Sequence, residues 1–152
     1  MGAAYFYHLT ESPADAVLRV LLPRALGQGW RVELRGRTEE TMATLDRALW
    51  SGPPTAFLAH GVAGGTADAL QPVLLTTGGG AANAPTCVMS VEGAAVTAAE
   101  VAAMERVCIL FDGHDQGAVE TARVQWKTLT GAGISAQYWA QEDGRWAKKA
   151  ES

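Results

Sequence analysis

The sequence predicts a Rossmann-like α/β fold with three layers: an open, mostly parallel sheet with helices on both faces. Short apolar segments alternate along the chain with longer amphipathic segments, and this order favours right-handed crossovers between parallel strands. Residues 106–111 (RVCILF) are almost wholly apolar, as expected of a central strand covered on both faces. The length of 152 residues suits one domain, so residues 1–152 are expected to fold as a single unit.

Strands are predicted where aromatic, β-branched or other apolar residues lie between turn-forming residues. The first predicted strand (AYFYHL) is rich in aromatic residues, and a charged tail is expected after the last one. The predicted strands are residues 4–9, 30–34, 57–60, 73–77, 86–91, 106–111 and 134–140.

Helices are predicted from the spacing of apolar side chains and from residues that start and stop helices. Two of them begin at a threonine and one at an aspartate, which are residues that cap helix N-termini well. The first predicted helix has start signals at Thr10 and Ser12-Pro13 and ends near Gly27–Gly29, and the others run from Thr38 to Trp50, from Thr97 to Met104 and from Asp115 to Gly131.

The balance of charge argues against a general nucleic-acid-binding protein, because such domains are usually basic. The formal net charge is −4. Residues 1–122 hold 7 Lys+Arg and 13 Asp+Glu, a net of −6, whereas residues 123–152 hold 5 and 3, a net of +2. The basic character is therefore concentrated near the C-terminus. The same acidic balance disfavours direct binding of single-stranded DNA through stacking on the five tryptophans.

The sequence predicts a cytoplasmic protein. It contains no apolar run near the ~20 residues that a membrane helix needs, and residues 1–10 lack the basic residue of a signal peptide. Cys87 and Cys108 lie inside apolar runs, without the spacing of a metal site. We expect two buried, inert thiols, the alternatives being a disulfide or a metal site.

The chain lacks the motifs of enzymes and nucleotide-binding proteins that use this kind of sheet. GxxxxGK[ST] and GxSxG do not occur, and no GxGxxG follows the first predicted strand. His8, His60 and His114 lack metal-ligand spacing, so no cofactor, metal or catalytic activity is expected. The alternative is a small nucleotide-binding protein or enzyme with its site at the strand ends near Asp112 and Asp115. Capping of a helix is the competing role for these two aspartates.

Four short motifs occur in one order along the chain: FYHL at 6–9, LDRALW at 45–50, FLAH at 57–60 and ARVQWKTLTGAGISAQYW at 122–139. Together with the ending YWAQEDGRWAKK, they resemble the chi subunit family of bacterial DNA polymerase III. The resemblance implies the fold described above and a non-catalytic adaptor of DNA replication with two binding faces. One face would receive the acidic, Phe-terminated tail of single-stranded DNA-binding protein. The other would hold the psi subunit, another clamp-loader component or a helicase, so that contact with DNA is only indirect.

The resemblance assigns Arg123, Trp126 and Lys127 to the face for the acidic tail. On a helix these positions are i, i+3 and i+4, so they lie on one side. Arg123 can pair with a terminal carboxylate, Lys127 with acidic residues, and Trp126 can contact the terminal Phe ring. The alternative is that Trp126 packs inward while the two cations extend over it.

The chain departs from the family pattern along this helix, where relatives often carry further basic residues. It has Val119 and Gln125 at such positions. The site is therefore expected to be weaker or to recruit basic residues of the charged tail, which are Arg145, Lys148 and Lys149. Asp112 would oppose an acidic ligand if its carboxylate faced the site.

The resemblance assigns Trp50, Phe57 and His60 to the face for psi or another clamp-loader partner. Trp50 ends a predicted helix and Phe57 follows a Pro-Pro turn, so both are expected near the surface as interface anchors. The alternative is that both aromatic side chains belong to the core.

Overall fold

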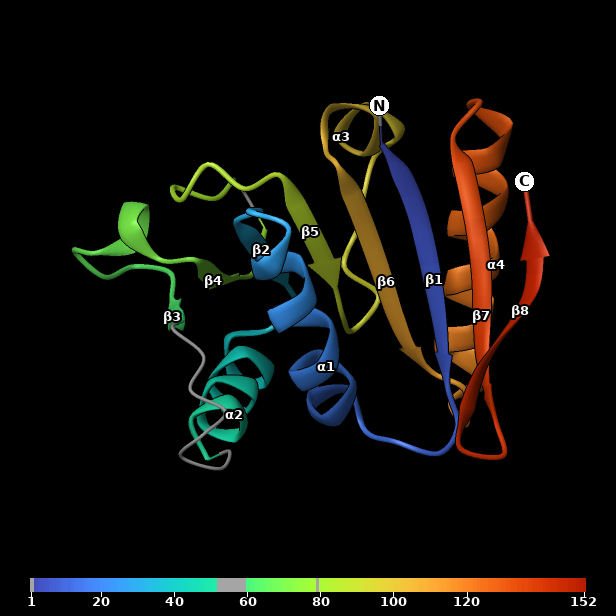
Figure 1. Ribbon diagram of the computed structural model, residues 1–152, viewed down its shortest axis with the longest axis horizontal. Coiled ribbons are helices and arrows are strands. Elements are labelled where there is room, and N and C mark those ends of the chain that lie inside the picture. Colours follow the sequence, from blue (N-terminus) through green and yellow to red (C-terminus); the bar gives the residue numbers. More distant parts are fainter. Residues whose placement is uncertain (1, 52–59, 79) are drawn as a thin grey trace.

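Within residues 2–51, 60–78 and 80–152, which the computed structural model describes, eight strands form one sheet (Figure 1). The strand order is β3-β4-β2-β5-β6-β1-β7-β8, and every neighbouring pair is parallel except β7 and β8. The bounds are β1 Ala3–Leu9, β2 Val32–Arg35, β3 His60–Val62, β4 Val73–Thr76, β5 Cys87–Ser90, β6 Arg106–Asp112, β7 Ser135–Glu142 and β8 Arg145–Glu151.

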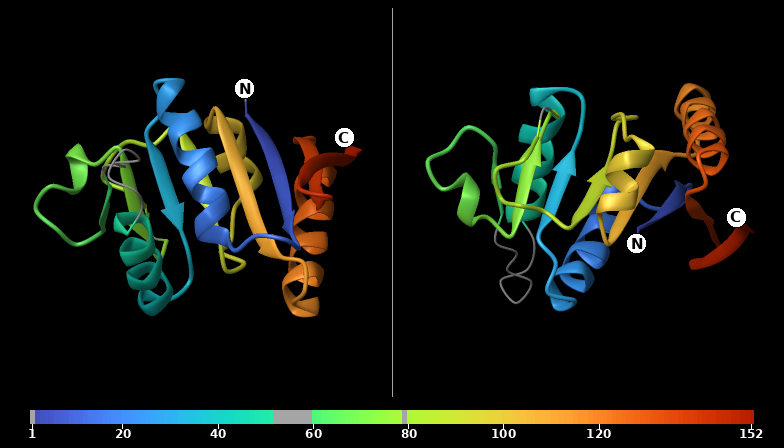
Figure 2. Two further views of the ribbon diagram at one scale, coloured as in Figure 1. Left: turned by 60° about the horizontal axis from the view of Figure 1, so that its bottom comes forward. Right: turned by 90° about the horizontal axis from the view of Figure 1, so that it is seen from above.

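Helices cover both faces of this sheet, as the sequence predicts (Figure 2). Buried residues of α1 and α2 join one hydrophobic core, and buried residues of α3 and α4 join a second core on the opposite face. The bounds are α1 Ala14–Gly27, α2 Glu39–Trp50, α3 Ala98–Ala103 and α4 Gln116–Gly131, with a short 3-10 helix, η2, at Asp68–Leu70. The prediction of a three-layer α/β fold is confirmed. None of the helices in the described ranges is long and apolar enough to cross a membrane.

The strand β1 shows how the sequence divides its side chains between the two cores. Successive side chains of a strand point to opposite faces of the sheet. Accordingly, Ala4 and Phe6 pack with α3 and α4, whereas Tyr7 and Leu9 pack with α1 and α2. The predicted thiols, Cys87 and Cys108, are both buried and free.

The predicted starts of three helices are confirmed by their caps. The side chain of Thr38 accepts a hydrogen bond from the Thr41 amide, and that of Asp115 accepts one from Ala118. Thr97 forms a reciprocal capping box with Glu100. Each cap satisfies backbone donors that have no partner within the helix.

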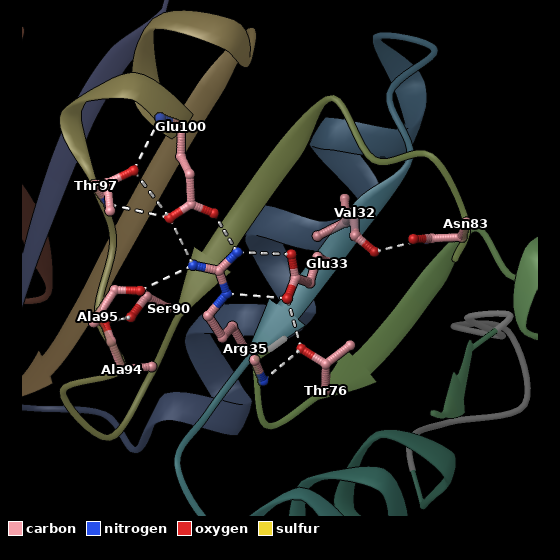
Figure 3. A network of polar contacts seen from close by, with 11 residues as sticks. Val32, Glu33, Arg35, Thr76, Asn83, Ser90, Ala94, Ala95, Thr97 and Glu100 are labelled. Carbon is pink, nitrogen blue, oxygen red and sulfur yellow. Dashed lines mark hydrogen bonds and ion pairs between the residues drawn. The ribbon is translucent and has the colours of Figure 1, made fainter. Parts of the chain in front are cut away.

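A buried polar network joins β2 to α3 (Figure 3). The Arg35 guanidinium donates two hydrogen bonds to Glu33, at 2.9 and 3.0 Å, and two to Glu100, at 2.6 and 3.1 Å. It donates another to the carbonyl of Ala95, and the Thr76 hydroxyl donates to Glu33. Polar groups on a central strand would be costly if they lacked partners, so this network replaces apolar packing at the point where α3 meets the sheet.

The prediction of a charged tail after the last strand is wrong. Residues Arg145–Glu151 form the edge strand β8, antiparallel to β7. The turn residues Asp143 and Gly144 both have positive φ, at 50° and 74°, as a tight hairpin turn requires. Trp146 anchors the new strand by packing edge-on against Tyr7, with ring centroids 5.2 Å apart.

The predicted strand at residues 57–60 falls largely outside the described residues. Of this segment only His60 is described, and it begins the edge strand β3.

Candidate functional site

The helix α4 carries Arg123, Trp126 and Lys127 on one side, as their spacing predicts. Arg123 and Lys127 are exposed, and Trp126 between them is half-buried. Among the described residues, neither cation forms a hydrogen bond or an ion pair. Both charges are therefore available to an incoming anion at no cost in internal contacts.

Trp126 joins the exposed side of α4 to the core beneath it. Its ring meets Phe6 of β1 nearly edge to face, with centroids 5.3 Å apart and planes at 66°. It also meets Tyr138 of β7, at 6.1 Å and 76°. These contacts fix the orientation of the indole while part of it stays exposed. Trp126 therefore packs inward against the core and at the same time offers part of its ring as an apolar surface.

His8 and Tyr138 lie beside Arg123 and are held together. The Nδ1 atom of His8 is 2.6 Å from the Tyr138 hydroxyl. A side chain at Gly113 would place its Cβ 2.2 Å from the His8 ring, so this position needs glycine. The rings of His8, Tyr138 and Phe111 contact one another, with centroids 5.1 to 5.9 Å apart.

The charge of Arg123 reaches both members of this pair. Burial lowers the pKa of His8, and the Arg123 charge lowers it further, against a hydrogen bond with the Gly113 backbone and the charge of Asp112. Burial raises the pKa of Tyr138, and the Arg123 charge partly offsets that rise. The imidazole of His8 and the phenol of Tyr138 are therefore both neutral near pH 7, and Arg123 supplies the positive charge beside them.

The second predicted set of residues lies at the opposite edge of the sheet. Trp50, at the end of α2, is 50% exposed, so it is not a core residue. Its indole stacks on His60 of β3, with ring centroids 4.2 Å apart. His60 is itself buried, and its Nε2 lies 3.2 Å from the carboxylate of Asp46. Phe57, the third predicted residue, lies outside the described residues.

The strand ends near Asp112 and Asp115, where the alternative function would have its site, border a cavity of about 890 Å³. Its floor is apolar, and its rim carries more acidic than basic side chains: Glu11, Glu92, Asp112 and Asp115 against Arg37. Asp112 accepts a hydrogen bond from the His114 amide, and Asp115 caps α4. No cluster of metal-ligating side chains was found in the described part of the chain.

The turn after β1, where related folds bind phosphate, is already filled. The amides of Thr10, Glu11 and Ser12 all donate to the side-chain oxygen of Gln141, at 2.9, 2.9 and 3.2 Å. Successive amides that converge in this way form an anion-binding concavity. Here a neutral carboxamide from β7 occupies it, so this geometry disfavours the nucleotide-binding alternative.

Sequence reasoning missed His8, Tyr138 and Gln141 as parts of these sites. The spacing of His8 argues against a metal-ligand role but gives no sign of its partner Tyr138, which follows 130 positions later in the chain. The available signal was the alternation within the first predicted strand, which places Phe6 and His8 on one face.

A comparison with protein families matches residues 1–137 to the DNA polymerase III chi subunit, HolC. The match includes β1 to β6, α1 to α4 and the start of β7, and it stops before most of the β7–β8 hairpin. The comparison with curated proteins gives no match. Because the family match spans most of the 152 residues, the chain belongs to the DNA polymerase III chi subunit family.

Proposed function

We propose that this chain is the adaptor that links the clamp loader to single-stranded DNA-binding protein during replication. It is an accessory component of the polymerase, not a catalytic one. The observation that carries the proposal is the exposed side of α4, where two cations without partners flank a half-buried tryptophan. An acidic peptide that ends in an aromatic residue needs these groups together.

In the proposed complex the terminal carboxylate lies against Arg123, because a guanidinium can donate two parallel hydrogen bonds to a carboxylate. The terminal Phe ring packs against the exposed part of Trp126, whose orientation Phe6 and Tyr138 already fix. Lys127 attracts the acidic residues upstream as a less directional point charge. Little ordering remains to be done on binding, which favours affinity.

For the second partner we propose the opposite edge of the sheet, around Trp50 and β3. Exposed Trp side chains are common anchors of protein interfaces, and Val62 and Leu70 add exposed apolar surface nearby in sequence. The chemistry fits an apolar protein partner such as psi, another clamp-loader component or a helicase. Both interactions would take place in the cytoplasm with the replicase.

The test is a calorimetric titration with a peptide that copies the C-terminal tail of the cognate single-stranded DNA-binding protein. Charge-assisted hydrogen bonds contribute about 1.5–3 kcal/mol each, so Arg123→Ala should weaken binding roughly ten- to a hundredfold. Lys127→Ala should cost less. Affinity should fall with salt, because exposed charges are screened within about 10 Å at 0.1 M. Removal of the final Phe should weaken binding even at high salt.

A matched control is Arg37→Ala. Arg37 is exposed and has no side-chain hydrogen bond or ion pair among the described residues, and it lies in the loop between β2 and α2. Arg37→Ala removes the same charge from a loop outside α4, on the rim of the cavity that Asp112 and Asp115 border. Equal affinities for folded wild type and Arg123→Ala, or equal losses for Arg123→Ala and Arg37→Ala, would place the site elsewhere.

A further inference from the structure

The β7–β8 hairpin presents one face on the same side of the sheet as α4. Side chains directly opposite one another in an antiparallel pair share a face. Tyr138 is opposite Ala150, and Ala140 is opposite Ala147. Tyr138 packs with the core under α4, so the three alanines continue that face outward from the Trp126 ring. Ala140 and Ala147 are half-buried and Ala150 is exposed.

The same face of the hairpin is basic at its border. Arg145 is opposite Glu142 and is exposed, with no hydrogen bond or ion pair among the described residues. Lys149, at the irregularity in the strand pairing, contacts Glu142. Lys148 belongs to the other face, because it is opposite Trp139 and its ammonium lies 3.3 Å from Glu151.

Together with α4, this face has an excess of positive charge. Arg123 and Lys127 lie on the helix side, and Arg145 and Lys149 lie on the hairpin side. Against these four cations stand two carboxylates, Glu142 of the hairpin and Glu120, which the helical spacing places on the same side of α4 as Arg123. Ala140, Ala147 and Ala150 lie between these charged residues, and because their side chains are small they leave the backbone of β7 and β8 thinly covered. A strip of small apolar side chains with cations on two sides complements an extended peptide that is both acidic and aromatic-ended.

We propose that the peptide-binding face has two halves, the exposed side of α4 and the β7–β8 hairpin. The strip formed by Ala140, Ala147 and Ala150 is the floor of the hairpin half, and Arg145 and Lys149 form its outer cationic border. The occupant is the acidic, aromatic-ended peptide that α4 binds, so this inference rests on the proposed function. Tyr138 joins the two halves, because its ring contacts Trp126 and its hydroxyl is fixed by His8. Most of this hairpin lies beyond residue 137, where the family match ends.

The neighbouring lysines of β8 provide the test, because the ammonium of Lys149 contacts Glu142 of the α4 face whereas that of Lys148 contacts Glu151 of the other face. Their side-chain exposures are similar, 41% for Lys148 and 44% for Lys149. Each contacts one glutamate, so the variants Lys148→Gln and Lys149→Gln lose the same charge and one surface ion pair each. The probe is a short synthetic peptide, rich in aspartate, that ends in phenylalanine with a free carboxylate. Exposed ion pairs are each weak, so Lys149→Gln should reduce affinity about two- to fivefold, and Arg145→Gln by a similar factor. Lys148→Gln should leave affinity unchanged within about 1.5-fold.

A second readout follows the backbone amides of Ala147 and Ala150 by NMR during the titration, with thermal unfolding as the check that each variant is folded. Both amides should shift with the same saturation curve as the amide of Trp126. Equal effects of Lys148→Gln and Lys149→Gln, or unshifted alanine amides with binding that still depends on Arg123, would overturn the hairpin proposal and leave the proposed function standing. Failure of the wild-type chain to bind the peptide at low salt would refute both.

Discussion

Substitution of Arg35 by Met should destabilise the protein severely, because it removes one partner from a buried charge network. The Arg35 guanidinium donates to two carboxylates and a carbonyl, and the side chain of Glu33 is only 2% exposed. Without Arg35, the hydrogen bond from Thr76 is the one that remains to the buried Glu33 carboxylate among the described residues.

The expected loss follows from general experience with buried ion pairs. Removal of one partner costs about 3–5 kcal/mol, because the remaining charge is buried without compensation. A domain has about 5–15 kcal/mol of total stability, so the variant should be marginal. In urea, with a slope of about 1–3 kcal/mol per molar, the midpoint of unfolding should fall by more than about 1 M.

The assay is urea unfolding followed by circular dichroism, with Arg37→Met as the matched control. Arg37 is two positions away in the sequence and exposed, so its loss should change the free energy of unfolding by less than about 0.5 kcal/mol. A triple variant with apolar residues at 33, 35 and 100 should recover part of the loss, since apolar replacement of a whole buried ion network is often tolerated. A loss below about 1 kcal/mol for Arg35→Met would refute the view that this network supports the fold.

Three further predictions concern the pH dependence of this network, the turn after β1 and the partner face around Trp50. The Arg35 side chain holds the pKa of Glu100 below its usual range, against the effect of burial. The stability that this pair contributes is present above the unfolded-state pKa of about 4.3 and should be lost as pH falls through the lower folded-state pKa. Urea midpoints measured between pH 6 and 3 should therefore fall more steeply for wild type than for Glu100→Gln. Gln141→Ala should lower the free energy of unfolding by about 1–3 kcal/mol, because it leaves three amides without their acceptor. Gln141→Glu should keep most of the stability. Equal unfolding midpoints for the two variants would show that water replaces the carboxamide. Trp50→Ala and Phe57→Ala should each weaken binding of a clamp-loader partner by at least about 2 kcal/mol, while the acidic peptide still binds. Loss of peptide binding in folded variants would contradict the separation of the two faces. Unfolding of Phe57→Ala would mean that this residue belongs to the core.

The parts of the site that lie on one helix could be predicted from the sequence, because helix geometry is local. The spacing of Arg123, Trp126 and Lys127 determines that they share a side, whatever the rest of the chain does. The capping role of Asp115 was predictable for the same reason. The exposure of Trp50 was predictable only as one of two alternatives, since it depends on what packs against the end of α2.

The parts that depend on strand order were not predictable from these patterns. Which strand lies beside β1 is decided by the whole sheet, so the pairing of His8 with Tyr138 and of Thr10 with Gln141 had no local signal. The strand β8 was missed for a different reason. Its alternation is obscured by two adjacent lysines at the irregularity in pairing, although the Asp143-Gly144 pair before it is a strong hairpin signal.

The strand order also separates the two proposed binding faces. The edge strand β3 lies beside Trp50 and the edge strand β8 lies beyond α4, with six strands between them (Figure 1). At about 4.8 Å per strand, seven spacings give roughly 34 Å, which is several times the screening length of about 8 Å at physiological salt. Charges of a bound acidic peptide are therefore screened from the β3 edge, and the two partners should bind with nearly independent affinities. Under the proposed function the chain would act by tethering, because a partner bound at one face raises the local concentration of the other partner.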